Sequence, residues 1–187
     1  MGVALAAGFA IVGCGVAVDG VAFPAVDVSV SLPITPTIAE RVNGRNDGTP
    51  FEPCVAYTTE ELIGLGANPA SVRDAGFSDS PNFRGCGWRT PDNKKSISQI
   101  VGDEPSLEVY KKKHSWRPWQ ADRTVLGRRI AVAAETNTGG CIAVFASIDA
   151  VVISGLSTTS LGVPSPGFVE ECDTAFAFAS LAVSKAP

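Results

Sequence analysis

The side chains with the most defined chemistry in this chain are its five cysteines. Four of them lie far apart in the sequence: Cys54, Cys86, Cys141 and Cys172. They form no Cys-x-x-Cys pair and have no histidine partners, so we expect no metal site. An even number of widely spaced cysteines instead predicts two disulfides, with three possible connectivities, in a protein that works outside the cytoplasm.

The fifth cysteine, Cys14, lies in the uncharged apolar run Val3–Val18. This run is short for a transmembrane helix and suits the hydrophobic region of a signal peptide, although no Lys or Arg precedes it. Within it, Ile11-Val12-Gly13-Cys14 resembles a bacterial lipobox, whose cysteine thiol receives diacylglycerol before cleavage. We therefore predict a signal region over residues 1–13 and a lipidated Cys14. The alternative is a buried thiol in a hydrophobic strand.

Residues 14–48 contain Pro24, Pro33 and Pro36 and end in a polar stretch rich in Asn, Gly and Asp. A proline-rich chain is extended and semi-rigid, so we interpret this segment as a tether. The alternative is an edge strand over the alternating valines at positions 26, 28 and 30. With acylated Cys14 at one end, the tether would hold a single domain, residues 49–187, at the extracytoplasmic face of the cell membrane.

Catalytic residues are hard to find. His114 is the only histidine, and the chain has no Gly-x-Ser-x-Gly nucleophile motif. The acidic pairs are adjacent in sequence, which suits helix starts and turns better than acid-base catalysis. We therefore expect a protein that is not an enzyme and needs no cofactor. The net charge of -4 likewise argues against binding to nucleic acid.

The most suggestive binding segment is YKKKHSWRPWQADR, residues 110–123. Exposed indoles beside cations suit sugars, anionic lipid headgroups or a protein partner. The candidate binding residues here are Lys113, His114, Trp116, Arg117 and Trp119. The alternative is that one tryptophan packs beneath the segment and the lysines keep an edge strand soluble. Trp88 is more simply a core residue beside a disulfide.

The elements that position these residues follow from periodicity and turn signals. Thr58 and the acids after it predict a short helix that stops at Gly66 and Pro69, and residues 164–186 predict a longer helix with an apolar stripe. Strands are expected over residues 84–90, 95–101, 106–113, 128–135 and 141–153. The fold class is therefore α+β, an antiparallel sheet of about five strands packed with a short N-terminal and a longer C-terminal helix.

This arrangement favours one disulfide connectivity. Cys54 and Cys172 belong to the two predicted helical regions, whereas Cys86 and Cys141 each open a predicted strand. Pairing like with like gives Cys54 with Cys172 and Cys86 with Cys141, each closing a long loop.

The order of these motifs resembles a known family. Pro53-Cys54 before a short helix, Cys86-Gly87-Trp88, Cys141 opening an apolar strand, and Cys172 with Ala175 in a terminal helix are similar to actinobacterial lipoproteins that carry domain of unknown function 3558. The resemblance covers about residues 49 to 187. It implies an exported, envelope-anchored lipoprotein, and it implies no activity and no catalytic residues.

Two functions remain open at this point. The first is a non-catalytic binding protein for an envelope lipid, glycolipid or small ligand. The second is an accessory subunit of a membrane protein complex in the cell envelope. A deep apolar pocket would favour the first, whereas a filled core with an exposed tryptophan and arginine patch would favour the second.

Overall fold

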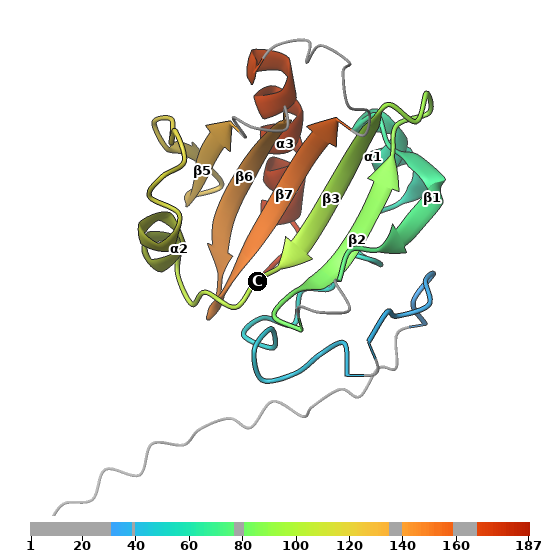
Figure 1. Ribbon diagram of the computed structural model, residues 1–187, viewed down its shortest axis with the longest axis horizontal. Helices are drawn as coiled ribbons and strands as arrows, with labels where there is room; N and C mark the ends of the chain where they lie inside the picture. Colours follow the sequence, from blue (N-terminus) through green and yellow to red (C-terminus); the bar gives the residue numbers. More distant parts are fainter. Residues whose placement is uncertain (1–30, 39, 77–80, 135–139, 159–167) are drawn as a thin grey trace, which may run out of the picture.

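The computed structural model describes residues 31–38, 40–76, 81–134, 140–158 and 168–187. An antiparallel sheet of seven strands, in the order β1-β2-β3-β7-β6-β5-β4, dominates these residues (Figure 1). The strands are β1 (Asn68–Asp74), β2 (Arg84–Arg89), β3 (Lys95–Val101), β4 (Arg123–Val125), β5 (Arg128–Ala134), β6 (Gly140–Ser147) and β7 (Ala150–Thr158). The helices are α1 (Thr59–Gly64), α2 (Leu107–Lys113) and α3 (Phe168–Val183). The predicted α+β class is confirmed.

The short helix α1 begins and ends where its sequence signals place it. The Thr58 hydroxyl accepts a hydrogen bond from the Glu61 N–H, and the Glu61 carboxylate accepts one from the Thr58 N–H, which completes a capping box. Gly66 follows the helix with φ +77°, a conformation that glycine adopts without strain. This local chemistry sets Cys54 just before the helix and β1 just after it.

The predicted strand over residues 106–113 is wrong, because this segment forms helix α2. Ser106 caps it by accepting a hydrogen bond from the Val109 N–H, and three lysines occupy its last turn, where the helix dipole favours cations. Leu107 and Tyr110, three residues apart, are its buried residues. That spacing suits one face of a helix, and the run of lysines conceals it.

The strand count also differs from the expected five. The predicted strand 141–153 is two strands, because the chain turns sharply at Ile148, with φ +54°, between β6 and β7. Strands β1 and β4 were not predicted. Strand β1 begins at Asn68-Pro69 and is only half-buried, and β4 has three residues, so neither shows the alternation that identifies a strand. The missed strand β1 carries Arg73, which matters for the site below.

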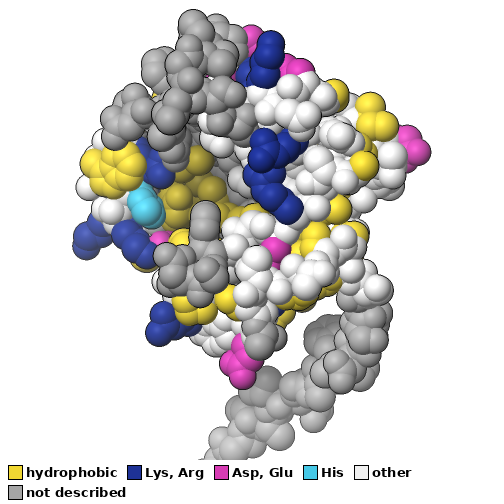
Figure 2. Space-filling view, turned by 45° about the vertical axis from the view of Figure 1, so that its right-hand side comes forward, with side chains coloured by type: hydrophobic (Ala, Val, Ile, Leu, Met, Phe, Trp, Pro, Cys, Tyr) yellow, Lys and Arg dark blue, Asp and Glu magenta, His cyan; other side chains and the backbone are white. Residues whose placement is uncertain are grey.

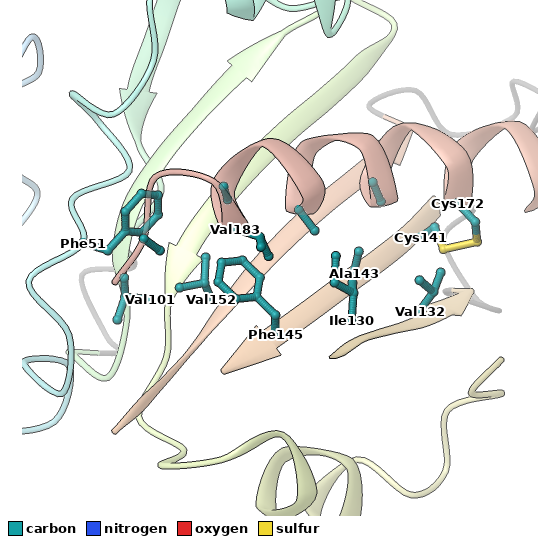
Figure 3. Packing of buried hydrophobic residues seen from close by; sticks show 14 of the residues in the cluster. Phe51, Val101, Ile130, Val132, Cys141, Ala143, Phe145, Val152, Cys172 and Val183 are labelled. Atoms are coloured by element: carbon teal, nitrogen blue, oxygen red, sulfur yellow. A yellow bond between two sulfur atoms is a disulfide. The ribbon is translucent and has the colours of Figure 1, made fainter. Parts of the chain in front are cut away.

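Helix α3 covers one face of the sheet and forms the main core there (Figures 1 and 3). The predicted stripe is confirmed at Cys172, Ala175, Ala179 and Val183, all buried against the sheet, although Phe176 is only partly buried. Its small alanines bring the helix close to β5, β6 and β7. The facing strands supply bulkier side chains: Ile130, Val132, Phe145 and Val152. This face of the sheet is therefore filled by protein.

The second part of the core lies between β2, β3 and the side of α3 that carries Phe178. Trp88 is 1% exposed and packs with Tyr57 and Phe178, with ring centroids 5.1 to 6.3 Å apart. Cys54 and Cys86 belong to the same cluster. The prediction that Trp88 packs in the core beside a disulfide is confirmed.

The two disulfides exist, but the predicted pairing is wrong. Cys54 bonds to Cys86, and Cys141 bonds to Cys172. Strands β2 and β6 are separated by β3 and β7. Cys86 and Cys141 therefore lie roughly 14 Å apart, at about 4.8 Å per strand, beyond the reach of a disulfide. Cys141 on β6 is instead joined to Cys172 on α3, and Cys86 on β2 to Cys54 in the segment before α1.

These disulfides indicate an extracytoplasmic protein, since such bonds persist in oxidising compartments. Among the described residues, no helix has the length and apolar character needed to cross a membrane. Cys14, the signal region 1–13 and the valines at 26, 28 and 30 lie outside the described residues, as do residues 164–167 of the predicted C-terminal helix.

The last residues of the predicted tether pack against the domain. Arg41 is 6% exposed, and its guanidinium donates to the Glu52 carboxylate at 2.5 and 3.0 Å and to the Gly85 carbonyl at 3.1 Å. Asn46 is fully buried and donates to the carbonyls of Arg41 and Pro81. Residues 41–48 are therefore part of the folded unit. Contacts with the domain begin earlier still, because Leu32 and Ile34 pack against the cluster that contains Trp88 and Thr37 donates to Asp74.

Candidate functional site

The predicted binding segment, residues 110–123, comprises the end of α2 and the chain that leads to β4. Its most exposed aromatic residue is Trp116, at 64% exposure. The guanidinium carbon of Arg117 lies 4.6 Å from the centroid of this ring, a cation-π contact. An indole held in solvent by a stacked arginine suits contact with another molecule.

Trp119 has a different environment from Trp116. It is half-buried, packs against the cluster beneath α2, and donates from its indole nitrogen to the His114 carbonyl at 3.0 Å. Its ring lies 6.1 Å from that of Tyr110 in an edge-on arrangement. Trp119 therefore packs the segment against the sheet. This is the alternative stated above for one of the two tryptophans, that it packs beneath the segment and is not a binding residue.

The cations of the segment are largely committed to nearby acids. The Lys113 ammonium lies 2.6 Å from Glu104 and 3.6 Å from Asp103, and the hydrogen bond to Glu104 raises the pKa of Lys113. His114 lies 3.9 Å from the same Glu104 carboxylate, but burial and the charge of Arg117 lower the pKa of its imidazole. Lys111 pairs with Asp122 at 2.7 Å. These pairs connect α2 and His114 with the loop before the helix and with the chain that leads to β4.

The sheet face opposite α3, here called the open face, has a different character. Side chains alternate across a strand, so the residues of the open face follow from strand register. One row runs across the sheet through Arg73, Gly87, Ser98, Gly155, Ile142 and Ala133, and ends at a bridge from Ala133 to Trp119. In this row, β1 carries a cation, β2, β3 and β7 carry small residues, and β6 and β5 carry apolar residues.

A cleft of about 250 Å³ lies over the cationic and small part of the open face. It is lined by Arg73, Asp74, Ala75, Gly76, Gly87, Ser96, Ser98, Ile100 and Ser157. Nearer to α2, beside the histidine, Figure 2 shows a hollow whose floor is hydrophobic, with Lys or Arg side chains at its edges. The apolar side chains that continue from Ile100 across the face are Ile153, Ile142 and Val144, which pack beneath α2 and Trp119.

Arg73 is the charged residue of this cleft. A Cβ atom at Gly87 would lie 3.6 Å from the Arg73 guanidinium, an ordinary contact distance, so the Arg73 side chain lies directly over Gly87 as it crosses β2. The guanidinium then donates to the Ser96 hydroxyl on β3. Burial and the nearby charge of Arg89 lower the pKa of Arg73. Sequence reasoning missed this residue because it missed β1, and no motif distinguishes Arg73 from the other arginines.

A second cleft, of about 480 Å³, lies beside the buried residues Arg41 and Arg84. The Arg84 guanidinium donates to the carbonyls of Asn46, Thr49 and Phe51 at 2.5 to 3.0 Å and lies 3.2 Å from the Glu52 carboxylate. These hydrogen bonds hold residues 46–52 against the sheet. Since the buried arginines already have protein partners, we interpret this cleft as structural.

Comparison with known proteins places the chain in a family. No curated protein and no solved structure matches it. One family model, described as "Protein of unknown function (DUF3558)", matches residues 9–185. The chain therefore belongs to the DUF3558 family.

Proposed function

We propose that this chain is a lipoprotein of the cell envelope that binds a lipid, glycolipid or other small ligand on the open face, without catalysing a reaction. The disulfides support an extracytoplasmic location, and the lipobox-like Ile11-Val12-Gly13-Cys14 supports a membrane anchor. In this proposal Cys14 carries the lipid and the domain faces away from the membrane interior.

The observation that carries the binding proposal is the contrast between the two faces of the sheet. Helix α3 fills one face with buried side chains, whereas the other face has a cleft lined by glycine, serine and arginine. Residues as small as Gly87, Ser98 and Gly155 leave space above the sheet where a helix or larger side chains would otherwise pack. A concave site with a few polar groups beside apolar residues is the common form of a small-ligand site.

Gly155 offers a direct test of this site. A Cβ atom at position 155 would lie 3.0 Å from the hydroxyl of Ser98, which lines the cleft, and 4.0 Å from Ile142. Gly155→Val would therefore fill space beside the cleft and displace the Ser98 hydroxyl slightly, while valine suits a strand. The control is Gly64→Ala, because a Cβ atom there meets nothing within 4 Å. We expect both variants to fold.

The measurement is mass spectrometry of lipids that co-purify with the full chain from native membranes. The wild type and Gly64→Ala should carry the same bound species, and Gly155→Val should lose it by tenfold or more. Equal retention by all three proteins would place ligand binding elsewhere. The mature N-terminus from the same preparation tests the anchor: an acylated Cys14 is expected, and an unmodified Cys14 would contradict it.

The accessory-subunit function is favoured by a separate observation, the exposed Trp116 stacked on Arg117. In this alternative, Trp116 inserts into a membrane protein of the envelope. Trp116→Ala should then abolish crosslinking to that partner and leave bound lipids unchanged, whereas Gly155→Val should do the reverse. The pair of variants therefore separates the two functions.

A further inference from the structure

Two arginines share the open face, and no acidic side chain of the described residues pairs with either of them. Arg73 reaches over Gly87 to Ser96, and Arg89 lies two residues further along β2, opposite Ser96 in the register. Residues two apart in a strand point to the same face, so Arg89 borders the cleft that Arg73 lines. Within the described part of the chain, neither guanidinium forms an ion pair.

Like charges placed together cost free energy unless something offsets the repulsion. Burial lowers the pKa of Arg73, and the nearby charge of Arg89 lowers it further. Some cations elsewhere in the protein are matched with carboxylates, as Arg41 is with Glu52 and Lys111 with Asp122. No carboxylate of the described residues pairs with the two arginines of the open face, which leaves their positive charge available to a ligand.

Two serine hydroxyls near the arginines provide further hydrogen-bond donors for the oxygen atoms of a ligand. Ser98 and Ser157 line the same cleft, and among the described residues their hydroxyls have no hydrogen-bond partner. Arginine guanidiniums bind phosphate, sulfate and carboxylate groups through paired N–H donors, and hydroxyls add further donors. Asp74, the acid that lines this cleft, accepts hydrogen bonds from Thr37 and Gly76 and lies 3.8 Å from Arg41.

We infer that the open-face cleft recognises an anionic oxygen group of its ligand, a phosphate, sulfate or carboxylate, which binds between Arg73 and Arg89 and the serine hydroxyls. The inference rests on the proposed binding function and specifies its ligand. The partly buried Ile100, which lines the cleft at the edge of the apolar cluster, would then contact the remainder of the molecule.

The test uses the full chain carrying Cys14→Ser, which cannot be acylated, and three probes. Dodecyl phosphate has both an anion and an apolar chain, inorganic phosphate has the anion alone, and dodecyl maltoside has the chain with a neutral headgroup. Binding is measured by calorimetry, and amide shifts in β2 and β3 locate each probe. The variants are Arg73→Gln, Arg89→Gln and their combination. The control, Lys112→Gln with Arg45→Gln, removes the same charge from exposed positions away from the cleft.

We expect dodecyl phosphate to shift amides of β2 and β3 and to bind the double variant at least about tenfold more weakly, while the control binds normally. Equal binding of dodecyl phosphate and dodecyl maltoside, unaffected by the arginine variants, would overturn the anionic site and leave the ligand-binding function intact. If inorganic phosphate binds but dodecyl phosphate does not, and the arginine variants abolish phosphate binding, the anionic site is supported. The proposal that the ligand also has an apolar part is then contradicted. If no probe binds, both proposals are overturned.

Discussion

Removing the Cys141–Cys172 disulfide should lower the free energy of unfolding by about 4 kcal/mol. The two residues are separated by 31 positions, and in the chain-entropy model the release of a loop of this length from the unfolded chain accounts for about that amount. The variant is Cys141→Ala with Cys172→Ala. Both side chains are at most 1% exposed, so lost packing adds to the effect.

The Cys54–Cys86 disulfide provides a matched comparison, because its separation of 32 positions closes a loop of nearly the same length. Urea unfolding followed by circular dichroism, without reductant, gives the free energy of unfolding for the wild type and both double alanine variants. The two disulfides should have similar effects. A loss below about 1 kcal/mol for either would refute the loop argument.

A single substitution also tests the connectivity itself. Cys172→Ser should leave the Cys141 thiol free, so alkylation after denaturation should label Cys141 and leave Cys54 and Cys86 bonded to each other. Peptide mapping identifies the labelled residue. Labelling of Cys54 instead would show that the like-with-like pairing was correct and that the sheet order is wrong.

Two further predictions concern the buried charges near the start of the domain. Arg84→Ala should lower the free energy of unfolding by about 3 kcal/mol or more in thermal or urea unfolding, because it leaves three carbonyls and the Glu52 carboxylate without their donor. The control Arg45→Ala, at an exposed position, should lower it by less than about 0.5 kcal/mol. Equal losses for the two variants would contradict this account. The second prediction is that Asp74 stabilises the fold at neutral pH and does so less in acid. Burial opposes the ionisation of Asp74, but hydrogen bonds from Thr37 and Gly76 and the charge of Arg41 outweigh it and lower the pKa of Asp74 below its usual 3.8. A lowered carboxyl pKa gives stability that is present above the unfolded-state pKa and is lost as the pH falls through the folded-state pKa. Urea unfolding across this acid range should therefore show a shallower loss for Asp74→Asn than for the wild type, and identical slopes would refute the assignment.

Local sequence signals predicted much of the secondary structure of this protein. The cap at Thr58, the glycine stop at Gly66 and the apolar stripe of α3 depend on residues close in sequence, so they are visible without the fold. The apolar runs of β5, β6 and the first part of β7 were identified for the same reason, apart from the turn at Ile148. Helix α2 was missed because only Leu107 and Tyr110 mark its buried side.

The sequence by itself determined the class of fold, the presence of two disulfides and the core position of Trp88, because composition and periodicity specify what must be buried. Only the tertiary structure decided which cysteines pair, since strand order places β3 and β7 between Cys86 and Cys141. It also decided the candidate site. Arg73, Gly87, Ser98 and Gly155 come from four different strands, and their proximity depends on strand order and register, which no local sequence signal encodes.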